Sequence, residues 1–154
     1  MDVEARLARA GLKLPDAPSP AANYVPAVIA KGLVFIAGQA PVRDGKYAFT
    51  GRVGSEVTLE EAQAAACLCG LNVLAQVKAA VSGDWSRVKG CVRICGYVSS
   101  APGFFEQPKV LDGASDLMVQ ALGEAGKHAR SALGVAALRG NVPVVVDAIF
   151  ELAD

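Results

Sequence analysis

Two charged residues lie in apolar stretches near the C-terminus, where a core strand ordinarily carries no charge. Arg130 stands at the start of the apolar run 129–138, and Asp147 lies inside a second run, 142–150. Arg139-Gly140-Asn141 separates the runs, and a short gap with glycine and asparagine between two strand-length runs is typical of a hairpin turn. The sequence therefore predicts an antiparallel hairpin over 129–152, with Arg130 and Asp147 on adjacent strands.

Such a pair allows two interpretations. In the first, Arg130 and Asp147 form a partly buried salt bridge that fixes the register of the strands. In the second, the guanidinium group of Arg130 binds a ligand carboxylate through two parallel hydrogen bonds, and Asp147 orients a water molecule beside it. The residue types alone leave both interpretations open.

A tyrosine and a glycine turn are further candidates in the first third of the chain. The Pro- and Ala-rich stretch 14–22 breaks regular structure and leads to Asn23-Tyr24 before the first strand. Gly38 ends an apolar run, and Pro41 prevents the strand from simply continuing. We therefore expect the backbone to turn or bulge there and to expose polar groups at Gly38-Gln39.

Several other chemistries lack their motifs. No Gly-x-Ser-x-Gly elbow and no phosphate-binding glycine loop occur. His128 is the only imidazole and has no evident carboxylate to orient it, which favours a surface or loop-end position. The four cysteines, at positions 67, 69, 91 and 95, include no Cys-x-x-Cys, and we expect them to be buried free thiols rather than ligands of a metal.

Composition limits the class of protein. The 154 residues suffice for one domain, and 53% of them are apolar, which suggests that some apolar surface is buried against other subunits. A formal net charge of zero, with no cluster of Lys or Arg, argues against a nucleic-acid binder. No signal peptide and no stretch of membrane-spanning length is recognised, so we expect a cytoplasmic protein.

Hydrophobic periodicity predicts an α+β domain of four to six strands with two main helices. We expect a short helix over 2–10, strands over 25–30 and 33–37, a helix from the Thr58 capping box to Ser82-Gly83, a strand over 91–98, and a helix over 113–122 capped by Asp112.

Three side chains in these elements carry further expectations. Period two in the strand 91–98 places Val92 on the same face as Ile94, and Gly96 on this face marks a close packing contact. Asn72 lies off the apolar stripe of its helix, so we expect a solvated or locally bonded amide.

Three stretches, in order along the chain, resemble the RidA/YjgF family of reactive-intermediate deaminases, which was once labelled L-PSP endoribonuclease. Asn23-Tyr24 precedes the first hairpin, and the stretch from Ala37 to Pro41 resembles the family's S-G-Q-x-P. The stretch from Ala129 to Val135 resembles its A-R-S-x-x-x-V signature, which is the most specific of the three.

This resemblance implies a chorismate-mutase-like α+β fold, with a mixed sheet and two helices on one face, assembled as a homotrimer with clefts between subunits. The expected parts are an N-terminal helix and arm, 1–22, and a RidA-like domain, 23–154. The implied reaction is hydrolysis of 2-imino acids to 2-keto acids and ammonia, with no metal or cofactor. The only partner implied besides other subunits is a small carboxylate substrate.

The resemblance also assigns roles to residues. Arg130 corresponds to the arginine that binds the substrate carboxylate, Tyr24 to a tyrosine of the cleft, and Gly38 to the turn beside it. Asp147 falls where the deaminases carry a glutamate that positions water. The substrate-binding positions implied are Gly38, Ala37, Ser131 and Ala132.

The sequence departs from the family pattern at several of these positions. Ala37 replaces a serine, Asp147 is one methylene shorter than glutamate, and Ala132 and Arg139 stand where cysteine and proline are common. The segment 103–113 is longer than in typical deaminases. Three hypotheses therefore stand, in this order: an imine hydrolase that uses Arg130, a non-catalytic trimeric binder of small carboxylates, and an RNA-cleaving protein.

Overall fold

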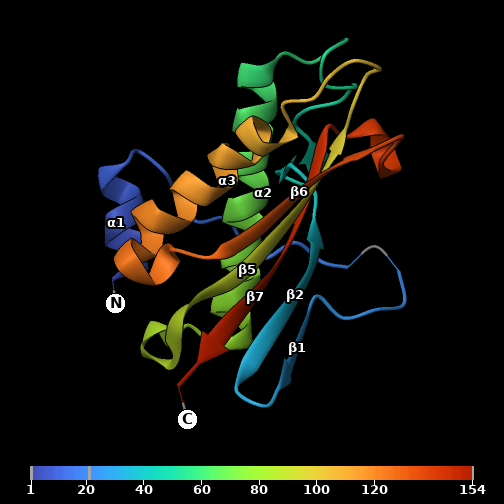
Figure 1. Cartoon of the computed structure of the whole chain (residues 1–154). Coiled ribbons are helices and arrows are strands. Elements are labelled where there is room, and N and C mark those ends of the chain that lie inside the picture. Colours follow the sequence, from blue (N-terminus) through green and yellow to red (C-terminus); the bar gives the residue numbers. More distant parts are fainter. Residues whose placement is uncertain (1, 21, 154) are drawn as a thin grey trace.

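A five-stranded mixed sheet forms one layer of the computed structural model, and helices cover one of its faces (Figure 1). The structure describes residues 2–20 and 22–153. The elements are α1 (Val3–Arg9), β1 (Ala27–Ala30), β2 (Leu33–Gln39), β3 (Val42–Arg43), β4 (Lys46–Tyr47), α2 (Leu59–Ala80), η1 (Trp85–Arg87), β5 (Val88–Ser99), α3 (Gln107–Leu122), η2 (Gly123–Gly126), β6 (Ala129–Val135), η3 (Arg139–Asn141) and β7 (Val144–Leu152). The predicted α+β class is confirmed.

The predicted hairpin over 129–152 is wrong. The strand order is β1-β2-β7-β5-β6, so β5 lies between β6 and β7. β6 pairs with β5 in parallel, and β7 pairs antiparallel with β5 and with β2. The apolar runs identified the strands, but eight residues separate the end of β6 from the start of β7, enough to cross over β5 instead of folding straight back.

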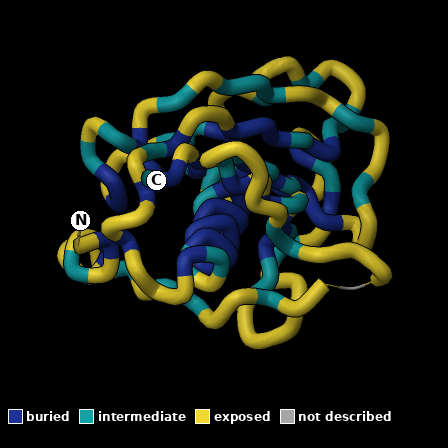
Figure 2. Tube along the Cα trace, turned by 90° about the horizontal axis from the view of Figure 1, so that it is seen from below, coloured by how far each residue is buried: buried dark blue, intermediate teal, exposed yellow. Residues whose placement is uncertain are grey.

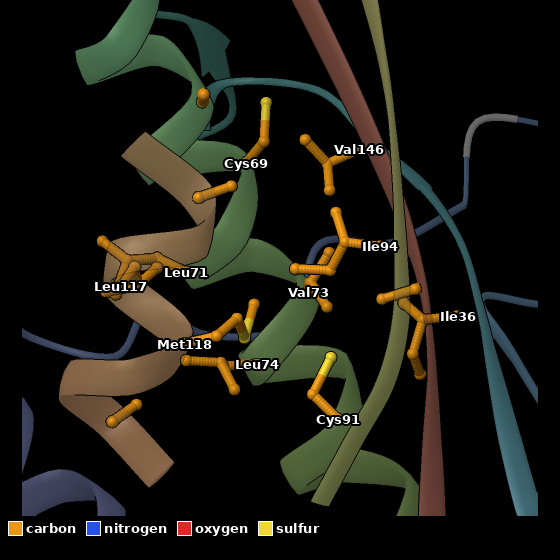
Figure 3. Close-up of a cluster of buried hydrophobic side chains, with 14 of the residues drawn as sticks. Ile36, Cys69, Leu71, Val73, Leu74, Cys91, Ile94, Leu117, Met118 and Val146 are labelled. Carbon is orange, nitrogen blue, oxygen red and sulfur yellow. The ribbon is translucent and has the colours of Figure 1, made fainter. Parts of the chain in front are cut away.

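Helix α2 forms the centre of the molecule and begins at the predicted capping box. The Thr58 side chain accepts a hydrogen bond from the backbone N–H of Glu61, and the Glu61 side chain accepts one from the backbone N–H of Thr58. Most of the helix is buried, because it packs against the sheet on one side and against α3 on the other (Figures 2 and 3). Within residues 2–20 and 22–153, no helix has both the length and the hydropathy needed to cross a membrane.

Helix α3 begins at Gln107, six residues before the predicted start, so Asp112 is not its cap. Pro108 is tolerated because the N–H groups of a helix's first turn have no partner within the helix. Helix α1 starts where predicted, and its Val3 and Leu7 are fully buried in the same core as α2 and α3. The division of the chain at residue 22 stays a prediction.

Strand β5 contains an irregularity that reverses the expected faces of two residues. The register shifts between Cys91 and Arg93, so Cys91 points into the core while Val92 is exposed (Figure 3). Gly96 makes the close contact expected of it: a Cβ atom there would lie 2.1 Å from Cδ1 of Leu111. All four cysteines are free thiols; Cys69, Cys91 and Cys95 are buried, and Cys67 is half-buried.

The buried Cys91 predicts a loss of stability in alkali. Burial raises the pKa of its thiol from 9.0 to about 12. As the pH rises, the unfolded chain therefore loses this proton at a lower pH than the folded chain does. The contribution of the thiol to stability is complete below pH 9 and falls as the pH rises toward 12. In urea titrations, the free-energy difference between wild type and Cys91→Ala should shrink by about 2 kcal/mol from pH 8 to pH 10.5. A constant difference would contradict burial of an ionisable thiol at this position.

Candidate ligand site on two edges of the sheet

Arg130 lies on β6, an edge strand, and its side chain is 25% exposed. Its Nη1 donates to Asp112 Oδ1 at 2.8 Å and to Ser115 Oγ at 3.1 Å, and both acceptors belong to α3. Neither Nη2 nor Nε donates to any residue in the described ranges. The guanidinium group is therefore held on one side and leaves its other edge for an anion.

The first interpretation, a salt bridge between Arg130 and Asp147, is wrong, because the two side chains lie on opposite faces of the sheet. Arg130 is in register with Ile94 on the helix-covered face. Asp147 is in register with Cys95 and points to the uncovered face, which we call the open face. The error follows from the misplaced hairpin, since β6 and β7 are not neighbours.

Asp147 binds a tyrosine instead. Tyr97 donates its hydroxyl to Asp147 Oδ2 at 2.9 Å across β5 and β7. Hydrogen bonding to Cys95 and to Asp147, together with burial, raises the pKa of Tyr97 well above its usual value. The Asp147 carboxylate is thus engaged within the chain, and its predicted role in orienting water stays a prediction.

His128 contacts Ser115, one of the two α3 residues that hold Arg130. Its Nδ1 lies 2.6 Å from the carbonyl oxygen of Gly126, which can only accept, so Nδ1 carries the proton. Nε2, 2.9 Å from Ser115 Oγ, then accepts from the hydroxyl in the neutral imidazole. This leaves Ser115 Oγ free to accept from Arg130. His128 lies at the expected loop end, directly before β6, and is half-buried against that serine.

A pocket of about 200 Å³ lies on the other side of the molecule, beside β2 and β7. Tyr24 and Gly38, both predicted site residues, line it together with Val145 of β7. A Cβ atom on Gly38 would lie 2.9 Å from Val145 Cγ1, which explains why a glycine fits there. The side chain of β7 in this pocket is therefore a valine, and Asp147 does not line it.

Two buried amides hold the walls of this pocket, and neither role was predicted from the sequence. Asn72 is 1% exposed, and its Nδ2 donates to the carbonyl oxygens of Ala40 and Val42, each at 3.0 Å. Gln76, one turn later on α2, donates to the carbonyl oxygen of Pro18 in the N-terminal arm at 2.5 Å. The expectation of a solvated or locally bonded Asn72 is wrong. Two amides four residues apart, within the stretch 64–77 of α2 that is otherwise free of polar side chains apart from thiols, were the available signal.

The remaining predicted residues are divided between the two edges. Ala37 is half-buried on β2, and its N–H donates to the carbonyl oxygen of Pro26 at 2.9 Å. Ala132 packs against the core two residues after Arg130. Ser131 is in register with Cys95 and accepts from Arg93 Nη2 at 3.4 Å.

Within one chain, the predicted site residues do not meet. Arg130, Ser131 and Ala132 lie on β6, while Tyr24, Ala37 and Gly38 lie at the β1–β2 edge, with β7 and β5 between them (Figure 1). The predicted site residues therefore form two separate groups in this chain, one at each edge of the sheet.

Residues 4–152 match a family described as "YjgF/chorismate_mutase-like, putative endoribonuclease". The chain belongs to the YjgF family. It is 46% identical over 151 residues to protein TCP17 of Trypanosoma cruzi, a match that covers 97% of this chain and 94% of the relative. The RidA/YjgF resemblance and the chorismate-mutase-like fold are thereby confirmed.

Solved structures agree with this YjgF membership. The crystal structure of Atu1372 from Agrobacterium tumefaciens, a protein of unknown function, superposes with a TM-score of 0.93 at 47% identity, covering 98% of this chain and 92% of that one. Escherichia coli TdcF with bound serine shares the fold at 22% identity, with a TM-score of 0.64 and coverage of 89% and 94%.

Proposed function

We propose that this YjgF-family protein is a hydrolase of reactive imines and enamines, which converts 2-imino acids to 2-keto acids and ammonia. The observation that carries the proposal is the geometry of Arg130, whose guanidinium is fixed by Asp112 and Ser115 and keeps one edge open. A planar fork with two parallel donors fits a carboxylate. The serine held by TdcF, also a small molecule with a carboxylate, supports a ligand of this class.

We place the reaction in a cleft between subunits of a homotrimer. Because Arg130 and the Tyr24–Gly38 pocket lie at opposite edges of one sheet, a head-to-tail ring of three chains would bring the β6 edge of each against the pocket of the next. Apolar side chains exposed on the open face, among them Val28, Phe35 and Leu133, support burial against other copies. A cytoplasmic location belongs to the same proposal.

The proposed hydrolysis needs few catalytic groups from the protein. Water adds across the C=N bond, its oxygen to the carbon and one proton to the nitrogen. The C–N bond of the resulting carbinolamine then breaks as the hydroxyl proton passes to the nitrogen, which gives the 2-keto acid and ammonia. The imine carbon is already electrophilic. Arg130 can therefore accelerate the reaction by holding the carboxylate, which positions the bound imine for attack by water. The roles of Tyr24, Ala37, Ser131 and Ala132 in this cleft are part of the proposal.

One observation favours a second candidate, a non-catalytic trimeric binder of small carboxylate metabolites. None of the described residues that line the pocket is Asp or Glu, and Val145 is the contribution of β7. Without an acid there, the pocket lacks a side chain that would take a proton from water.

A turnover assay separates the two candidates. Wild type is incubated with freshly formed 2-iminopropionate, and loss of the imine is followed beside a titration with 2-oxobutyrate. We expect loss of the imine at least tenfold faster than in buffer. Binding of 2-oxobutyrate without acceleration would select the binder, and the absence of both would contradict either candidate.

A further inference from the structure

Arg139 is a cation on the pocket wall for which the fold provides no partner. It lies in the η3 turn, is exposed, and lines the pocket together with Tyr24 and Val145. Its guanidinium makes no ion pair and no hydrogen bond with any residue of 2–20 and 22–153. By contrast, Arg130 has Asp112, and Arg52 donates to the carbonyl oxygen of Ala136 at 2.6 Å.

The turn that carries Arg139 is fixed in place. Gly140 and Asn141 both have positive φ, at 69° and 55°, and Tyr47 packs so closely on Gly140 that a Cβ there would lie 2.2 Å from its ring. The N–H of Gly51 donates to the carbonyl oxygen of Asn141 at 2.7 Å. Arg139 is therefore presented from a defined turn, and Tyr47 itself lines the same pocket.

The rest of the lining makes the pocket suitable for an anion. The described lining residues include no Asp or Glu, so nothing in the wall neutralises Arg139. Tyr24 and Tyr47 also line the pocket, and a tyrosine hydroxyl is a donor that an anionic group can use. Pro18, Pro20 and Pro26 add apolar surface.

We infer that the ligand of this site carries a second anionic group, which Arg139 binds in the pocket, so that the substrate class is the 2-imino acids with an acidic side chain. The inference rests on the proposed function in one respect, namely that Arg130 of a neighbouring subunit binds the 2-carboxylate of the same molecule. Two arginines at the two ends of a cleft then select a dicarboxylate over a monocarboxylate of similar length.

Calorimetric titration of the full-length protein with two stable 2-keto acids tests the inference. We compare 2-oxoglutarate, a dicarboxylate, with 2-oxobutyrate, a monocarboxylate, in wild type, Arg139→Ala, Arg139→Lys and Arg130→Ala. Wild type should bind 2-oxoglutarate at least tenfold more tightly. Arg139→Ala should remove this preference while changing the affinity for 2-oxobutyrate less than twofold, and Arg139→Lys should restore part of it.

The outcomes separate this inference from the proposed function. Equal affinities of wild type for the two acids, or equal weakening of both by Arg139→Ala, would overturn the second anionic group. If Arg130→Ala leaves both affinities unchanged while Arg139→Ala still removes the preference, the proposed role of Arg130 fails and the dicarboxylate pocket stands. A wild type that binds neither acid overturns both.

Discussion

Replacing Arg130 by alanine should slow imine hydrolysis at least about a hundredfold and weaken 2-oxobutyrate binding by a similar factor. Two charge-assisted hydrogen bonds to a carboxylate are lost, each worth about 1.5–3 kcal/mol. The fold should survive, because the ion pair with Asp112 is partly exposed and contributes at most about 1 kcal/mol. Steady-state kinetics, calorimetry and a urea titration of the same preparation measure the three quantities.

Two further variants make this test specific. Arg130→Lys keeps the charge without the planar fork and should recover only part of the affinity. Arg93→Ala removes an exposed guanidinium from the neighbouring strand, where it donates to Ser131, and should change affinity less than twofold. An Arg130→Ala variant as active as wild type, or an Arg93→Ala variant equally impaired, would contradict the assignment of Arg130.

Replacing Asn72 by alanine should lower the free energy of unfolding by about 2 kcal/mol and also weaken ligand binding. The substitution removes both donors that pair with the carbonyl oxygens of Ala40 and Val42 in a buried setting. These carbonyls belong to the segment that follows Gly38 along the pocket wall, so the wall loses its attachment to α2. Urea titration and calorimetry with 2-oxobutyrate measure the two effects.

Gln63→Ala is the matched control. Gln63 is also an amide of α2, and its Nε2 donates to the carbonyl oxygen of Lys109 at 2.8 Å, but it is only half-buried and distant from the pocket lining. Gln63→Ala should lower the free energy of unfolding by less than about 1 kcal/mol and leave the affinity for 2-oxobutyrate unchanged. If Asn72→Ala left affinity at the wild-type value, the amide would be a packing residue without influence on the pocket.

The local elements of the fold were predictable because local rules govern them. The Thr58 capping box and the apolar period fixed the start and end of α2 closely. Lys31-Gly32, both at positive φ, form the tight turn between the predicted strands 25–30 and 33–37. The partner of each strand was not predictable in the same way. β6 and β7 are consecutive and both apolar, yet β5 lies between them, and no local pattern records that arrangement.

For the candidate site, too, local features were predictable and the arrangement of the strands was not. Arg130 was found because its neighbours form a recognisable signature, Tyr24 because it precedes the first hairpin, and Gly38 because it ends an apolar run, where β2 shifts register. The relation of Arg130 to Asp147 depended on strand order and was wrong. Asn72 was misjudged because its bonding partners are distant in the sequence. The carbonyl oxygens that it binds belong to Ala40 and Val42, which lie 32 and 30 positions away, and no local pattern identifies them.

The central claim is that each site joins Arg130 of one subunit to the Tyr24–Gly38 pocket of another. The most direct measurement is a crystal structure of the protein soaked with 2-oxobutyrate. We expect a trimer with ligand density in each cleft. The ligand carboxylate should lie on the open edge of Arg130, and its other end against Gly38 and Tyr24 of the adjacent subunit. Ligand bound by residues of a single chain, or Arg130 facing solvent far from any neighbouring pocket, would contradict it.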